Sequence, residues 1–150
     1  MRLRVESTVL VLIAMALLLA VAGRAQIRVE KPLHLSHVHG YVLSETGKPF
    51  VGVQVALASG GPPSQAMKTD ANGYFDFSNA KGEYLLHVKV PEFGIADRQV
   101  VVGAGLRALR HQGPIFVMIK PGICMDCTSP VFTSRKQFDR AIRLLKTSHD

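Results

Sequence analysis

Tryptophan is absent from this chain of 150 residues, and cysteine occurs only twice. The absence of tryptophan excludes a binding surface built on indole rings. The zinc-protease pattern H-E-x-x-H, the nucleophile pattern G-x-S-x-G and the phosphate-binding P-loop are missing as well. Acidic residues number 11 against 18 lysines and arginines, and they are scattered rather than paired. The sequence therefore predicts that the chain is not an enzyme.

The sequence also has no apolar run as long as a membrane-spanning helix needs; its longest apolar run lies near the start. Arg2 and Arg4 precede an apolar stretch over residues 9–22, which is shorter than the roughly 20 residues that a membrane-spanning helix needs. Gly23 and Ala25 follow at the spacing of a signal-peptidase site. We therefore expect a secretory signal peptide that is cleaved after Ala25 and a secreted or periplasmic protein; an uncleaved anchor is the alternative. No cysteine lies near the cut, which argues against a lipoprotein.

Apolar and polar residues alternate through most of the remaining chain. Such alternation is typical of half-buried strands, and segments rich in glycine and proline separate the runs. About seven short strands predict an all-β fold, a seven-stranded antiparallel Greek-key β-sandwich with a C-terminal amphipathic helix. The expected order is a signal peptide (1–25), an extended N-terminal segment (26–36), the sandwich (37–120), and a C-x-x-C loop with a basic helix (121–150).

Three segments carry this prediction most clearly. The stretch "FVGVQVALA" places four aliphatic side chains on one strand face, Val51, Val53, Val55 and Leu57. The stretch "EYLLHVKV" likewise places Tyr84, Leu86, Val88 and Val90 on one strand face. From Ser134 onward the spacing changes to that of a helix, with Phe138, Ala141, Ile142 and Leu145 on one face and basic residues on the other.

The stretch "TDANGYFDF", which begins at Thr69, resembles both a tight turn and the first half of a calcium loop. Asp70 and Asn72 have the spacing of calcium ligands, but such a loop needs further oxygen ligands and a bidentate acid several residues on. The residues that follow are apolar and alternate instead. An aspartate that bonds its own backbone, followed by Asn-Gly, is typical of a hairpin turn. We predict a turn here, with Phe75 and Phe77 pointing inward.

Several of these motifs occur together in one known family. The stretches "VHGYVLSETGKPFVGVQVAL", "KTDANGYFDF" and "GEYLLHVKV" resemble, in order and spacing, the carboxypeptidase regulatory-like domain, which is a transthyretin-like β-sandwich. The resemblance covers residues 38–102. It implies a non-catalytic module outside the cytoplasm, similar in fold to starch- and glycan-binding domains. No catalytic or binding residue carries over, because the shared motif consists of turn and core positions.

The histidines of "HLSHVH" are the candidates for a metal site. His37 and His39 project from the same side of an extended chain, so the pair would suit zinc or copper through imidazole nitrogens. A site needs a third or fourth ligand, and His34 points the other way if the strand begins early. Exposed strand histidines without a metal are the alternative, and we expect no resident cofactor.

Cys124 and Cys127 form the C-x-x-C pair. In an exported protein an even number of cysteines favours a disulfide bridge. Redox activity is the alternative suggested by this spacing, but Pro130 opposes the helix that such enzymes place after the first cysteine. Metal binding together with the histidines and an intermolecular bond also stay open. Thr128 stands where haem attachment requires histidine, which excludes that use.

Positive charge is the remaining signal, since the chain carries a formal net charge of +7. The candidates for partner binding are exposed basic residues of one loop and of the C-terminal helix: Arg107, Arg110, Arg135, Lys136, Arg140 and Arg143. A basic surface on an exported protein suggests an acidic partner or a membrane surface, and a merely solvated helix face is the alternative. Nucleic acid is not expected in that compartment.

Together these observations predict a non-catalytic exported interaction or structural module that binds an envelope or surface protein, or a glycan. For a glycan, Tyr41 and Tyr74 are the outward aromatic candidates. The alternative is a periplasmic metal-binding protein that uses His34, His37 and His39, with or without the C-x-x-C pair.

Overall fold

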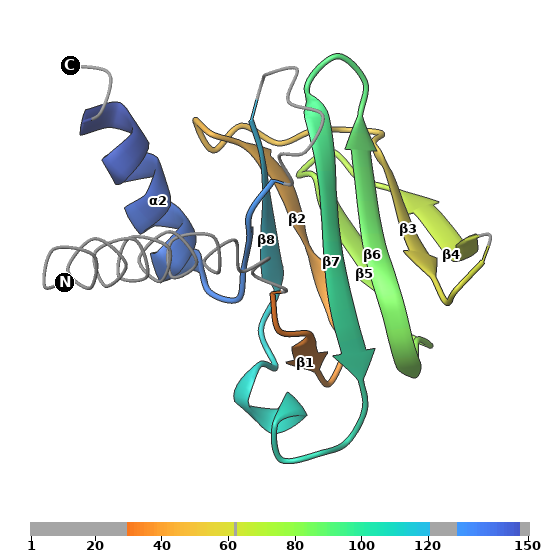
Figure 1. Cartoon of the computed structure of the whole chain (residues 1–150). Coiled ribbons are helices and arrows are strands. Elements are labelled where there is room, and N and C mark those ends of the chain that lie inside the picture. Colours follow the sequence, from red (N-terminus) through yellow and green to blue (C-terminus); the bar gives the residue numbers. More distant parts are fainter. Residues whose placement is uncertain (1–29, 62, 121–128, 148–150) are drawn as a thin grey trace, which may run out of the picture. The chain divides into compact units, whose positions relative to one another are not determined.

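The computed structural model describes residues 30–61, 63–120 and 129–147, which form two β-sheets, a short 3-10 helix and an α-helix (Figure 1). The strands are β1 (Leu33–Leu35), β2 (Val38–Ser44), β3 (Gln54–Ala58), β4 (Pro63–Lys68), β5 (Tyr74–Phe77), β6 (Gly82–Val90), β7 (Gly94–Val102), β8 (Ile115–Ile119) and β9 (Val131–Phe132). The 3-10 helix η1 (Ala108–Arg110) lies between β7 and β8, and helix α2 (Arg135–Thr147) follows β9.

Two of the predictions fall outside these ranges. The signal peptide expected over residues 1–25 and the bridge between Cys124 and Cys127 both lie in parts of the chain that the structure does not describe, so they stay predictions. Across residues 30–61, 63–120 and 129–147, no helix is long and apolar enough to cross a membrane.

The strands form two layers. One sheet has five strands in the order β1-β7-β6-β3-β4, and the other has four in the order β5-β2-β8-β9. The main hydrophobic core draws on both sheets, with Val55 and Leu57 from the first and Val42, Phe75 and Val117 from the second. The predicted mostly β architecture, with two packed sheets and a C-terminal helix, is therefore confirmed.

The finer prediction of seven antiparallel strands is not confirmed. The described residues hold nine strands, and two neighbouring pairs, β1 with β7 and β2 with β8, run parallel. Parallel neighbours need a long connection, and here the chain between β2 and β8 builds most of the other sheet before it returns. The sheets also extend beyond the predicted limits of 37–120, because β1 and β9 both hydrogen-bond into them.

Alternation predicted the buried faces well where the strand is regular. Phe75 and Phe77 are buried, and so are Leu86 and Val88. The prediction that Val51 lies on the same strand face as Val53, Val55 and Leu57 is wrong, since 61% of its surface is exposed. The reason lies in the next residue, Gly52, whose φ of 70° interrupts the extended chain, so that β3 begins only at Gln54.

Helix α2 packs on the outer face of the four-stranded sheet, on the side of β8 that faces away from β7 (Figure 1). Ser134 caps the helix, because its Oγ accepts a hydrogen bond from the backbone N–H of Gln137 at 3.3 Å. Phe138 is fully buried against Leu43, Phe116 and Met118. This second apolar cluster explains why all five residues of β8 are buried: alternate side chains face the main core and the helix.

Candidate functional site

The stretch "TDANGYFDF" forms the turn between β4 and β5. The Asp70 carboxylate oxygen Oδ1 accepts hydrogen bonds from the backbone N–H groups of Asn72 and Tyr74, both at 2.8 Å. Gly73 has a φ of 73°, and its N–H donates to the carbonyl oxygen of Asp70 at 3.0 Å. The predicted turn is confirmed, but the strands that it joins do not form a hairpin, because β4 lies in the five-stranded sheet and β5 in the four-stranded one. The aspartate that would open a calcium loop is used to hold the turn instead.

Beside this turn, four rings lie next to one another on the outer face of the four-stranded sheet. We call them the ring cluster: His37, His39, Tyr41 and Tyr74. The centroid distances are 4.7 Å between His37 and His39, 6.3 Å between His39 and Tyr74, and 5.2 Å between Tyr41 and Tyr74. Alternate residues of β2 point outward, and the antiparallel pairing of β2 with β5 places Tyr41 directly opposite Tyr74. Cross-strand register therefore assembles the cluster.

Asp76 holds two members of the ring cluster in place. Its Oδ1 atom lies 2.7 Å from His37 Nε2, and its Oδ2 atom accepts a hydrogen bond from the Tyr74 hydroxyl at 3.1 Å. Asp76 is the cross-strand partner of His39. Asp76 was not among the predicted site residues, although its outward position in "YFDF" follows from the alternation with two buried phenylalanines.

The surroundings of the ring cluster shift the pKa values of two of its members, His39 and Tyr74. Burial, and then the nearby His37, lower the pKa of His39 below its ordinary value, and Asp76 opposes them only in part. Burial, and then the hydrogen bond to Asp76, raise the pKa of Tyr74. At neutral pH the cluster therefore presents a neutral imidazole and an intact phenol. A tyrosine with a raised pKa is poorly suited to act as a base or nucleophile.

Three members of the ring cluster, His39, Tyr41 and Tyr74, line an open depression with a volume of about 630 Å³. The lining residues are His39, Tyr41, Asp70, Asn72, Tyr74, Pro114 and Arg135. Arg135, at the start of α2, lies over the rings of Phe116 and Phe138 at 5.8 and 5.6 Å and pairs with Asp139 at 2.9 Å. The depression thus combines ring faces with carboxylate, amide and guanidinium groups.

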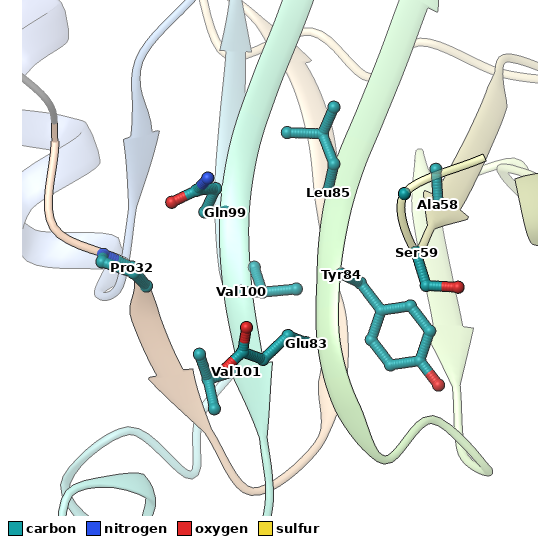
Figure 2. Close-up of a pocket in the computed structure, with 10 residues that line it drawn as sticks. Pro32, Ala58, Ser59, Glu83, Tyr84, Leu85, Gln99, Val100 and Val101 are labelled. Atoms are coloured by element: carbon teal, nitrogen blue, oxygen red, sulfur yellow. The ribbon is translucent and has the colours of Figure 1, made fainter.

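A second depression, of about 390 Å³, lies on the five-stranded sheet (Figure 2). Leu85 of β6 and Gln99 of β7 are cross-strand partners there, and Tyr84 points away from them toward Ser59. The Tyr84 hydroxyl donates to the carbonyl oxygen of Lys81 at 2.9 Å, so it is already engaged. Mostly aliphatic side chains and few convergent polar groups line this depression. It is the weaker candidate for a ligand site.

The structure separates the three histidines that the sequence groups together. His34 lies in β1 of the five-stranded sheet, opposite Val101, whereas His39 lies in β2 of the four-stranded sheet. His37 and His39 do lie together. Within the described part of the chain, no group of three or more His, Cys, Asp or Glu side chains is placed to hold a metal ion.

The predicted partner-binding residues also fall into two groups. Arg107 and Arg110 belong to the η1 region, which lies against β1. The other four, Arg135, Lys136, Arg140 and Arg143, lie on α2, which packs on β8 and β9. The two groups therefore come from separate elements that pack on different strands.

Comparison with known proteins agrees with the motifs. Residues 37–109 match the family model of the carboxypeptidase regulatory-like domain, a non-catalytic domain family. No curated protein matches the chain. The matched segment includes β2 and β5, which carry the ring cluster, and ends before β8, β9 and α2. Residues 37–109 are therefore similar to the carboxypeptidase regulatory-like domain.

Proposed function

We propose that this protein is a non-catalytic exported module that binds a glycan, and that the ring cluster is its binding site. The observation that carries the proposal is the pair Tyr41 and Tyr74, 5.2 Å apart, in the same depression as Asp70 and Asn72. A sugar ring has an apolar face of C–H bonds and a rim of hydroxyl groups. The electron-rich face of a phenol attracts such C–H bonds, and the carboxylate and amide suit the hydroxyls.

A binding role fits this site better than a catalytic one. Asp76 is held by His37 and the Tyr74 hydroxyl, and the Asp70 carboxylate is held by backbone N–H groups of its own turn. Both carboxylates thus have structural partners and would serve a ligand mainly as additional acceptors. Binding sites of this kind need a few fixed polar groups around an apolar surface.

The test is to screen the purified protein on an array of neutral and acidic oligosaccharides and to measure the affinity of a bound one by calorimetry. Replacing Tyr41 or Tyr74 with alanine removes one ring face, which we expect to weaken binding about 3- to 10-fold. The double variant should lose about 10- to 100-fold. Unchanged melting temperatures would show that the variants are folded.

The matched controls are Leu85→Ala and Gln99→Ala, which alter the second depression and should leave the affinity unchanged. If these variants lose binding while the tyrosine variants keep it, the second depression is the site. If the protein binds no oligosaccharide on the array, the glycan proposal fails and an envelope or surface protein becomes the partner to seek.

Metal binding is the second candidate, and one observation favours it. His37 and His39 lie with their rings 4.7 Å apart, and the lowered pKa of His39 keeps it in the neutral form that metals bind. If this function is correct, the protein should take up zinc or copper, and a variant with both histidines replaced by alanine should lose the metal. His34→Ala should keep it, because His34 lies in the other sheet. A protein that stays metal-free after dialysis against either ion contradicts this candidate.

A further inference from the structure

Helix α2 presents a row of cations on the side opposite its buried face. Phe138, Ala141, Ile142 and Leu145 pack toward the sandwich. At 3.6 residues per turn, Lys136, Arg140 and Arg143 lie along the opposite side of the helix, and all three are exposed. We call these three residues the basic stripe.

Among the described residues, the cations of the basic stripe form no ion pair. The one acidic residue of the helix, Asp139, pairs with Arg135 at 2.9 Å and lies to the side of the stripe. In the part of the chain that the structure describes, no carboxylate forms an ion pair with Lys136, Arg140 or Arg143. Lys146 adds a further exposed cation, and Leu144, beside the stripe, is 62% exposed.

From this arrangement we propose that the basic stripe docks the protein on a membrane surface rich in anionic lipids. A free amphipathic helix binds membranes by burying its apolar face, but here that face is already packed against β8. Attraction between the cations and lipid headgroups therefore has to supply most of the binding. The exposed side chain of Leu144 is placed to enter the headgroup region beside them.

A protein partner fits this surface less well. The stripe is about 10 Å long, since its ends lie seven positions apart along the helix and each position adds about 1.5 Å. A stable protein interface buries about 800 Å² on each partner, which is far more than this stripe offers. Electrostatic binding to lipids has no such minimum, because each lysine or arginine near the surface adds about fivefold to the binding. The inference rests on the helix and not on the ring cluster.

The test is to purify the protein in the form that the cell produces and to sediment it with vesicles. The vesicles consist of phosphatidylcholine alone or of phosphatidylcholine mixed with phosphatidylglycerol. We expect binding to the mixed vesicles at about 0.1 M salt, and its loss at about 1 M, where the screening length falls from about 10 to about 3 Å. The variant Lys136→Gln, Arg140→Gln, Arg143→Gln should bind about 100-fold more weakly. Any contribution of the N-terminal residues to binding is the same in the wild type and in this variant, so it cancels when the two affinities are compared.

The matched control removes three cations elsewhere, Lys89→Gln, Arg107→Gln and Arg110→Gln, and should bind like the wild type. Equal binding of the stripe variant and the wild type overturns the proposal, as does equal binding to vesicles with and without anionic lipid. Greater loss in the control than in the stripe variant would also overturn the proposal, because it would place the docking surface at Lys89, Arg107 or Arg110 instead. Binding to soluble heparin or polyglutamate without binding to anionic vesicles would also overturn it and point to a soluble polyanion.

Discussion

Replacing Gly40 with alanine is expected to unfold the sandwich or bring it close to unfolding. A Cβ atom at this position would lie 2.1 Å from the carbonyl oxygen of Ile115 and 2.7 Å from its Cγ1 atom. Gly40 in β2 pairs with Ile115 in β8, so the clashing oxygen belongs to a strand that is paired in the sheet. Relief of the clash requires the two central strands to separate. We expect a cost of about 4 kcal/mol or more, against a total stability of about 5–15 kcal/mol for a domain.

Thermal unfolding of the two proteins, followed by circular dichroism, measures this effect. The melting temperature should fall by about 15–20 °C, if the variant folds at all. Gly103→Ala is the control, because a Cβ atom there meets no atom within 4 Å. It should change the stability by about 0.5 kcal/mol at most. A Gly40→Ala variant as stable as this control would contradict the pairing of β2 with β8.

Replacing Phe138 with alanine is expected to release helix α2 from the sandwich. Phe138 is fully buried, with ring centroids 5.8 Å from Phe116 and 5.9 Å from Phe132. Loss of such a side chain costs about 3–5 kcal/mol. An isolated helix of this length is marginal in water, so the released segment should unfold. The main core should stay intact, because Phe138 belongs to the separate cluster beneath the helix.

Limited digestion with trypsin under native conditions reports this release, because α2 carries several lysines and arginines. A cost of about 3 kcal/mol raises the open population, and with it the cleavage rate, about 100-fold. Leu144→Ala, in the same helix but at a residue that is 62% exposed, should be cleaved like the wild type. Equal cleavage of both variants would contradict Phe138 as the anchor. Loss of the sandwich together with the helix would show that the two clusters unfold as one unit.

Local pattern was enough to predict the elements and most of their buried faces. Phe75 and Phe77 were predicted inward because they alternate with polar residues, and both are buried. The turn between β4 and β5 followed from the chemistry of Asp-Ala-Asn-Gly, which acts within five residues. The helix followed from the spacing of Phe138 and its apolar neighbours. Where a single residue breaks the local geometry, as Gly52 does after Val51, the alternation fails.

Only the tertiary structure decided which elements meet. His34 and His37 are three residues apart, yet the chain bends at residues 36–37 and passes from one sheet to the other, so His34 is separated from the ring cluster. Alternation reports which face of a strand is buried but not its direction, and the two parallel pairs were therefore missed. Tyr41 and Tyr74 were each predicted to face outward, and the register of β2 with β5 placed them together. The sequence by itself thus determined the motifs, the strands and an amphipathic helix, because these depend on neighbours along the chain. The ring cluster, and the packing of α2 that leaves its basic stripe exposed, depend on contacts between distant residues.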